Sequence, residues 1–502
     1  MKQIRSTLFA IIIVSVSYSQ ENTSADTVGL ARSKAYSQQF HEAERLLRLY
    51  TSTKNDLNAF RLQAQVLYWM KDFKQSAAVL QKALAAFPGE TILYLDYGRL
   101  LYNTGNITTS EKYLLNYQQT DSLHAETNLM LAHIWFWQGR FKEAAGLTKN
   151  IVKTYPDQQD ALNLLNEINF IRAVYVKVNA ATLSDDQPLS SQQVTVETGA
   201  CRSAFFAPKL KLTSFNFQTD QQSSFNWWLQ TGNTFSSGKN GLSLSLVGGL
   251  FQSTGTINVT GEVLLSKKIG RFVTADAMVA YKPYQLTVAA ARKAVMQTVY
   301  AGSFQYNQNN KWIGKAIYEV QQFPDNNQIY TAYAWLSAPI IHKEKFLLHT
   351  GYAFAWQTTA KNKAMYKEPL PPLAVIYNNG LQVQTVYDPY FTPLNQFVNS
   401  LLLSTKIFIS KKVAFSLRGS FGFLAQAEVP YYYVQFTPPQ YQLNKDFTVH
   451  QFNPAELFAG LELQPGKQFQ LQFNYQYNAV LFYKLHQGSI QLNYRFYHEK
   501  KQ

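Results

Sequence analysis

The chain has 502 residues, of which 46% are apolar and only 15% are charged, and its net charge is +15 at neutral pH. This length predicts two or more domains, and the charged fraction lies well below the roughly 25% typical of soluble domains. The single cysteine, Cys201, excludes an intrachain disulfide and is expected to be a small packing residue. No metal site and no cofactor are predicted.

The first residues have the pattern of a secretory signal peptide. Lys2 and Arg5 precede the apolar run "LFAIIIVSV" (8–16), and the small residues Ser17 and Ser19 follow at cleavage spacing. We therefore expect residues 1–19 to be removed on export. No later apolar run reaches 18 residues, which excludes a transmembrane helix. The exported chain is then either soluble or enters a membrane as strands.

Residues 24–172 contain a repeat of 33 to 34 positions that resembles the tetratricopeptide repeat. Four units are in phase, and helical spacing over 158–171 predicts a closing helix. Small residues are needed where the two helices of one hairpin touch, and large residues fill the gap to the next hairpin. Such an array is expected to bind a periplasmic or inner-membrane protein partner, although a plain spacer is the alternative. The residues predicted to pack the repeats are Ala31, Phe40, Ala43, Ala64, Phe73, Gly98, Ile107, Ala132, Phe141 and Ala144.

From residue 173 the period changes from helical to two. In "QFQLQFNYQYN" (468–478), aromatic and aliphatic residues alternate with Gln and Asn, and roughly sixteen segments of this kind follow one another. Many run to ten or more residues, which is enough for a tilted strand to cross a bilayer. We predict an outer-membrane β-barrel over 173–502 with its apolar faces toward lipid, against a soluble β-domain. The linker is expected at 180–193 or just before it, which leaves open whether 173–180 is the first strand.

The last strand and the loops give the barrel an expected orientation. "GSIQLNYRF" (488–496) alternates fully and resembles the C-terminal signal of bacterial outer-membrane barrels. Long segments at 357–396 and 425–452 interrupt the strand rhythm and are expected outside the cell. Short basic turns at 410–412 and 466–467 are expected on the periplasmic side.

Most of the positive charge belongs to the predicted barrel, since residues 173–502 hold 28 basic and 16 acidic residues, a net +12. A positive pore concentrates anions, whereas basic turns bind anionic lipid headgroups or solvate the rims. No catalytic motif is present, so an enzyme is not predicted; a pair of Asp388 with a histidine is the weak alternative. No nucleic-acid partner is predicted. The basic residues expected within strands are Lys177, Lys209, Lys211, Arg292, Lys315 and Arg418.

Two stretches of the barrel go beyond plain alternation: 286–320, with an Arg-x-x-Val pair before "TVYAG" and a Trp-x-Gly, and 386–410, with "YFTP" ahead of a strand. Both resemble the corresponding stretches of the cellulose synthase outer-membrane subunit. This chain departs from that family at Gln297, Thr298 and Leu394, and in having only four repeats. The resemblance implies an α + β multidomain chain, an α-solenoid of tetratricopeptide repeats followed by a transmembrane antiparallel β-barrel of about 16 strands. Its pore or loop candidates are Arg292, Trp312, Asp388, Tyr390, Phe391 and Pro393.

The resemblance also implies a function, a passive outer-membrane channel that exports a polysaccharide while its periplasmic repeats contact the synthase or other envelope partners. Gln, Asn, Tyr and Trp side chains let a glycan slide and exchange hydrogen bonds, which fits this composition. For "YDPYFTP" (387–393) the alternative is a rigid loop that narrows the mouth. For the whole chain the alternatives are an anchored binding or assembly scaffold, whose surface phage could reach, and an ordinary diffusion porin.

Overall fold

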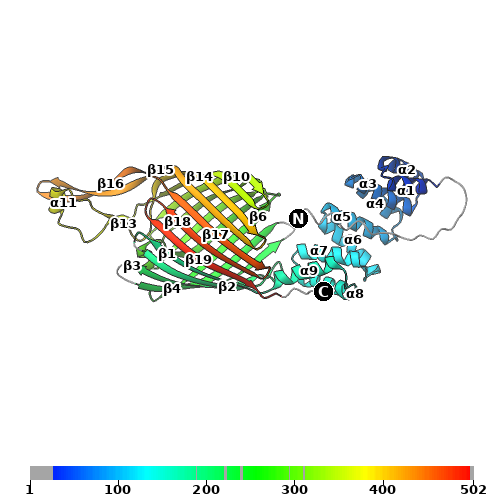
Figure 1. Cartoon of the computed structure of the whole chain (residues 1–502), viewed down its shortest axis with the longest axis horizontal. Helices are drawn as coiled ribbons and strands as arrows, with labels where there is room; N and C mark the ends of the chain where they lie inside the picture. The colour runs from blue at the N-terminus through cyan, green and yellow to red at the C-terminus, as the bar shows by residue number, and fades with distance from the viewer. Residues whose placement is uncertain are drawn as a thin grey trace. The chain divides into compact units, whose positions relative to one another are not determined.

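The computed structural model describes residues 26–187, 189–219, 223–237, 241–292, 294–308 and 311–497 (Figure 1). The predicted signal peptide, residues 1–19, lies outside these residues. The chain forms two compact units, residues 1–134 and 135–502. Across the described residues, no helix combines the length and the apolar character needed to span a membrane.

The helices of the described residues up to 172 are each 10 to 14 residues long and form antiparallel pairs, which confirms the predicted solenoid of tetratricopeptide repeats. Asp56 and Asp72 begin two of them as N-caps, because their carboxylates accept hydrogen bonds from backbone amides of the first turn. The helices of the described residues up to 172 are α1 (Thr27–Tyr36), α2 (Phe40–Thr53), α3 (Leu57–Trp69), α4 (Phe73–Ala86), α5 (Ile92–Thr104), α6 (Ile107–Thr120), α7 (Ala125–Trp137), α8 (Phe141–Thr154) and α9 (Gln159–Arg172).

The small repeat residues lie where the two helices of a pair meet. A Cβ atom on Gly98 would lie 2.8 Å from Cδ2 of Leu114, so a larger residue there would force the Leu114 side chain to move. In two repeats, the small residue on the second helix is a serine that bonds to the small residue on the first helix. The Ser76 hydroxyl donates to the carbonyl of Ala64 at 2.8 Å, and the Ser110 hydroxyl donates to the carbonyl of Gly98 at 2.7 Å. The alanines at these positions are fully or almost fully buried, namely Ala31, Ala43, Ala64, Ala132 and Ala144.

The larger repeat residues differ more in their surroundings. Phe40 packs against the cluster of α1 to α3 and lies 5.8 Å from the ring of Trp69. Phe141 is buried, while Ile107 is half-buried. Phe73 is 40% exposed and covers one side of Tyr68, with 5.4 Å between ring centroids. Phe73 therefore covers the edge of its helical hairpin and does not fill the centre, unlike Phe141.

Sixteen strands of the described residues close into an antiparallel barrel, as predicted, with β1 paired to both β2 and β19 (Figure 1). The ring consists of β1 (Tyr175–Asp185), β2 (Leu189–Gly199), β3 (Pro208–Thr219), β4 (Ser223–Ser237), β5 (Leu242–Ser253), β6 (Thr256–Ile269), β7 (Val273–Tyr284), β8 (Val295–Asn307), β9 (Ile313–Gln322), β10 (Gln328–Lys343), β11 (Phe346–Thr359), β14 (Leu394–Ser410), β15 (Val413–Thr437), β17 (Ala455–Gly466), β18 (Phe469–Ala479) and β19 (Lys484–Arg495).

The first strand settles where the linker lies. The segment 180–193 is the β1–β2 hairpin, so the linker expected there is wrong, and the chain passes from α9 to β1 through residues 173–174. The segment is polar because it forms a turn. Asp185 accepts hydrogen bonds from the backbone amides of Gln187 and Leu189 at 2.9 and 2.8 Å.

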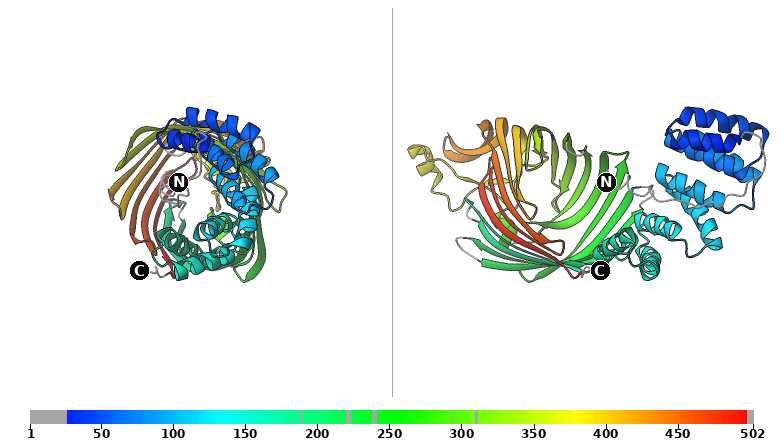
Figure 2. Two further views of the ribbon diagram at one scale, coloured as in Figure 1. Left: turned by 90° about the vertical axis from the view of Figure 1, so that its right-hand side faces the viewer. Right: turned by 45° about the vertical axis from the view of Figure 1, so that its right-hand side comes forward.

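The two ends of the barrel differ in their connections. We call the end at which α9 leads into β1 the near end, and the opposite end the far end. Near-end turns are short, whereas the far end carries 360–393, with β12 (Ala364–Tyr366), α11 (Leu373–Asn379) and β13 (Thr385–Tyr387). There, too, the second half of β15 pairs with β16 (Gln440–Phe452) as a hairpin that projects beyond the ring (Figure 2). Both predicted long segments are thus at the far end.

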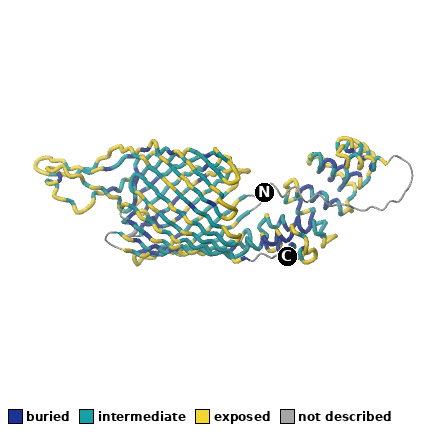
Figure 3. The backbone as a smooth tube through the Cα atoms, in the orientation of Figure 1, coloured by how far each residue is buried: buried dark blue, intermediate teal, exposed yellow. Residues whose placement is uncertain are grey.

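The barrel turns its apolar side outward. Along its strands exposed and less exposed positions alternate (Figure 3), and the exposed ones are large and apolar, such as Leu210, Val259 and Leu401. Val259 is 69% exposed. Their cross-strand neighbours share the same face, while Gln, Asn, Ser and charged residues occupy the other. An apolar outer face on a closed ring of long strands is the arrangement that lipid requires. The prediction of lipid-facing strands is confirmed in this geometry.

Candidate functional site

The lumen side of the barrel contains two adjoining cavities. One has a volume of about 370 Å³ and the other about 450 Å³, and they share Ile313, Ser404, Arg418 and Phe458. They lie along the inner wall of β9, β10, β14, β15, β17 and β18, with the second cavity also reaching β11. This stretch of wall is the candidate binding surface of the lumen.

The smaller cavity combines aromatic faces with hydrogen-bonding groups. Tyr333 and Trp335 are successive inward residues of β10, and Glu456 and Gln476 approach from β17 and β18. The guanidinium of Arg418 lies 4.1 Å from the ring centroid of Phe458, which holds it against the wall. Flat aromatic surfaces beside amide, acid and guanidinium groups suit a ligand with both apolar and hydroxylated faces.

The lumen wall carries little net charge. Lys177 lies 3.4 Å from Glu197, and Lys406 lies 3.4 Å from Glu462. Most of the positive charge predicted for the pore therefore lies elsewhere, in the turns. The inward positions of the described ring strands hold nine basic and seven acidic residues: Lys177, Lys209, Lys211, Lys268, Lys282, Lys315, Lys406, Arg418 and Arg495 against Asp185, Glu197, Glu262, Asp276, Glu319, Glu456 and Glu462.

At the far end, the β7–β8 connection packs against the inner wall. It contains the short helix α10 (Val288–Arg292). Val288 and Ala294 contact a buried cluster of inward side chains, Phe215 and Phe217 of β3 and Phe251 of β5 among them. Because these rings belong to the lumen face, this connection occupies part of the mouth.

Tyr390 of the "YDPYFTP" segment joins the other side of this connection. It is 1% exposed, clusters with Ala290 of α10, and stacks on Phe323 of the β9–β10 turn at 3.5 Å between ring centroids. The hydroxyl of Thr287 donates to the carbonyl of Pro389 at 2.5 Å. We call Thr287, Phe323, Asp325, Lys363 and Tyr390 the mouth cluster. It ties three far-end connections together at the mouth.

The centre of the mouth cluster is a carboxylate. Asp325 accepts hydrogen bonds from the Tyr390 hydroxyl at 2.8 and 2.9 Å and lies 2.5 Å from the Lys363 ammonium. Partial burial raises the pKa of Asp325, but the hydrogen bonds from Lys363 and Tyr390 outweigh this and hold the pKa below its usual 3.8. The carboxylate is therefore ionised at neutral pH.

The remaining candidates of this loop separate. Phe391 stacks on Phe482 and Tyr483 of the β18–β19 turn, each at 5.3 Å. Pro393 is buried and Asp388 is exposed. Thus Tyr390 and Pro393 lie in packing positions, and Phe391 is the half-buried ring that the loop presents beside the mouth.

Two candidates lie away from the positions expected for them. Arg292 ends α10 and is not part of a strand, because the turn after β7 coils into one short helix. Trp312 is in the near-end β8–β9 turn, 49% exposed, directly before the inward residue Ile313. Strand alternation places the Trp312 ring on the outer side, where aromatic residues mark the edge of a bilayer.

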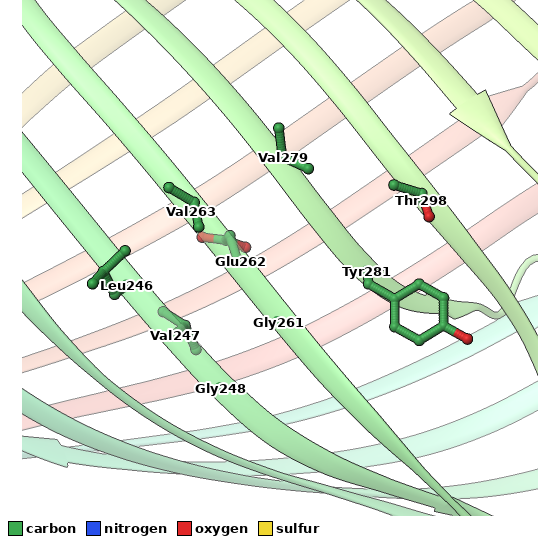
Figure 4. A pocket seen from close by; sticks show the side chains of 9 residues that line it. All are labelled: Leu246, Val247, Gly248, Gly261, Glu262, Val263, Val279, Tyr281 and Thr298. Atoms are coloured by element: carbon green, nitrogen blue, oxygen red, sulfur yellow. The ribbon is translucent and has the colours of Figure 1, made fainter.

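A further cavity of about 470 Å³ lies on the outer face and is lined mainly by apolar residues. Figure 4 shows Leu246, Val263 and Tyr281 on one side of β5 to β7, with Glu262 drawn behind the strands. The paired glycines Gly248 and Gly261 form its floor. As part of the lipid-facing surface it does not belong to the lumen.

The repeats carry a polar site of their own. Arg61 of α3 lies 2.5 Å from Asp96 of α5, Asp96 lies 3.2 Å from Arg99, and Arg99 lies 2.7 Å from Glu126 of α7. This charge ladder joins the first helices of three successive repeats. Sequence reasoning missed it, although charged residues recurring on the first helix of each unit are a usable signal. Trp335 was missed as well, although an aromatic residue on the polar face of a strand is a usable signal, whereas Arg418 was among the basic residues predicted within strands.

Neither a protein-family model nor a curated protein matches this sequence. Among solved structures, the chain is similar to a "bacterial polysaccharide outer membrane secretin", with 9% identity, 65% of this chain and 99% of that chain covered, and a TM-score of 0.47. The repeats are similar to YrrB, a tetratricopeptide-repeat protein "with an unusual peptide-binding site" (14% identity, 29% and 76% covered, TM-score 0.27). They are also similar to MamA from Desulfovibrio magneticus RS-1 (17%, 29% and 85%, 0.27).

Proposed function

We propose that this protein is an outer-membrane channel through which an extracellular polysaccharide leaves the cell, acting as a passive conduit and not as an enzyme. The observation that carries the proposal is the inner-wall cavity, where Tyr333 and Trp335 face Arg418, Glu456 and Gln476 inside a closed, lipid-facing barrel. A sugar chain offers C–H faces to the rings and hydroxyls to the polar groups. Because the wall is nearly neutral, it suits a neutral or weakly charged glycan.

The repeats are proposed to lie in the periplasm and to dock a synthase or another envelope partner. Short turns at the near end support this orientation, since bacterial barrels keep short turns on the periplasmic side. The charge ladder of Arg61, Asp96, Arg99 and Glu126 offers the partner matched positive and negative groups. We propose the class polysaccharide and not cellulose in particular, because Gln297 and Leu394 depart from the cellulose synthase subunit.

A second candidate function is an outer-membrane scaffold without glycan transport. The mouth cluster favours it, because α10 and Tyr390 fill part of the exit. A scaffold requires the repeats and the membrane anchor, but not the lumen wall. Substitutions in the lumen wall therefore distinguish the two candidate functions, because they should impair a channel but not a scaffold.

The test uses the full chain in planar bilayers with neutral and anionic oligosaccharides added to one side. Tyr333→Ala with Trp335→Ala is expected to weaken block by the neutral glycan roughly tenfold, the factor for about 1.4 kcal/mol. Trp356→Ala on the adjacent strand is the matched control, because Trp356 pairs with Ala332 on the lipid-facing side. Stronger block by the anion would contradict a nearly neutral wall.

A deletion strain supplies the cellular arm. It is expected to lose an extracellular glycan, to regain it with the Trp356→Ala gene, and to regain much less with the doubly substituted gene. Undiminished secretion of every extracellular glycan by the deletion strain would remove the channel proposal and leave the scaffold.

A further inference from the structure

The two ends of the barrel differ in charge. In near-end turns and on the outward positions of the adjoining strand ends, the described residues include nine basic side chains and one acidic side chain, Glu344. In the far-end connections the corresponding numbers are six and six. We call the nine near-end residues the basic belt; they are Arg202, Lys267, Arg271, Lys311, Lys343, Lys345, Lys411, Lys412 and Lys467.

Exposed aromatic residues accompany the belt in the same turns. Phe205 and Phe206 follow Arg202, Phe272 follows Arg271, and Trp312 follows Lys311. Phe205 is 68% exposed. Aromatic girdles mark the two interfaces of a membrane barrel, so these turns lie at the level of the lipid headgroups.

We infer that the basic belt binds the phosphate groups of anionic phospholipids in the leaflet at the near end of the barrel. The belt draws on six of the near-end turns, so it surrounds the barrel and does not mark one point of the lumen. Lys and Arg beside an anionic surface each strengthen binding about fivefold. The inference rests on the barrel spanning a membrane and is independent of what the lumen transports.

An acidic cargo or an acidic protein is the competing ligand for such a belt. A cargo site would require the excess of positive charge on inward strand positions as well, where basic and acidic residues are nearly equal. A binding site for a protein would require the basic residues to be gathered in one patch, whereas six turns around the barrel each contribute at least one belt residue. The position beside the aromatic residues favours lipid.

The experiment uses the refolded full chain in zwitterionic detergent micelles and measures binding of short-chain phosphatidylglycerol and of phosphatidylcholine. The belt variant is Arg271→Gln with Lys411→Gln and Lys412→Gln. The control is Lys361→Gln with Lys367→Gln and Lys484→Gln, which removes the same charge from the far end. We expect the belt variant to lose more than tenfold in phosphatidylglycerol affinity and the control less than twofold. Added salt should weaken the wild-type affinity, since the contacts are exposed.

Retention of heat-modifiable gel mobility shows that each variant barrel is folded. Equal loss of affinity in the belt variant and the control would overturn the inference, as would no preference of the wild type for phosphatidylglycerol over phosphatidylcholine. Soluble polyuronate and polyglutamate are the remaining probes. If either binds through the belt residues while phosphatidylglycerol does not, the belt serves an acidic polymer and the lipid inference is wrong.

Discussion

The repeat helices bury their apolar residues in a core, whereas the barrel strands expose theirs on the outer wall. Leu47 of α2 is fully buried among other helices, whereas Leu210 of β3 is 47% exposed on the outer wall. The serines differ as well: Ser110 is buried in a helix contact, and the serines of β5 face the lumen. The difference teaches that one chain is folded for two solvents, since burial from water governs the helices and contact with lipid governs the strands.

The largest test of this contrast is Phe60→Ala in α3. Phe60 is 1% exposed at the centre of a helical cluster, so truncation should lower the free energy of unfolding of the helical unit by about 3–5 kcal/mol. The measurement is urea unfolding of the full chain followed by circular dichroism at the helical band. Phe73→Ala, half exposed, is the control and should cost clearly less. Equal effects would contradict helices that fold as a water-soluble core.

A charge on the outer wall probes the other solvent. Leu246 lies near the middle of β5 on the outer face, so Leu246→Arg should destabilise the membrane-folded barrel by about 2–4 kcal/mol. Folding into lipid vesicles, read from gel mobility, measures this. The neighbouring Ser245 faces the lumen, and Ser245→Arg is expected to change little. A tolerated arginine at 246 would mean that this face does not meet lipid.

A smaller effect is expected where the repeats use a polar contact. Ser110→Ala removes the 2.7 Å hydrogen bond to the Gly98 carbonyl and should cost about 1 kcal/mol in the same unfolding assay. Ser52 also donates to a backbone carbonyl, but it is exposed, so Ser52→Ala should be close to neutral. If the two changes had the same effect, burial would not be what gives the Ser110 contact its value.

The smallest effect is local and depends on pH. The pKa of Asp325 in the folded loop is lower than its usual 3.8. The ionised carboxylate therefore stabilises the loop fully above pH 3.8, and this stabilisation is lost as the pH falls through the lower pKa of the folded state. Hydrogen exchange of 386–393 in detergent should therefore accelerate in acid while the strands stay protected. Asp325→Asn should exchange faster at neutral pH and lose this pH dependence. An unchanged profile in the variant would show that another group governs the loop.

Periodicity predicted both folds because each depends on local spacing. The small residues at 31, 64, 98 and 132 recur with the repeat, and the alternation in 468–478 is visible without any neighbour. The long far-end segments and the number of strands were predicted for the same reason. The linker was misplaced because a polar hairpin and a polar linker have the same composition, as 180–193 shows.

The site was less predictable because its parts come from distant positions. Tyr390 was singled out from its motif, yet its partners Phe323, Asp325 and Lys363 lie on other connections and have no pattern of their own. The cavity of Trp335 and Arg418 depends on which strands are neighbours in the ring and on their register, which alternation alone does not give. The sequence predicted the net charge of the barrel but not its distribution between lumen and turns, because a net charge counts lysines in turns and in strands equally.

The long strand β15 has a practical consequence. Val413 to Phe421 pair with β17 and complete the wall, and β15 keeps its pairing with β14 as far as Glu428; Val429 to Thr437 lie beyond the ring, in the hairpin with β16. The tip at 438–439 can therefore be interrupted without opening the seam. We expect it to accept a foreign peptide, which would make this barrel a carrier for displaying epitopes or affinity tags.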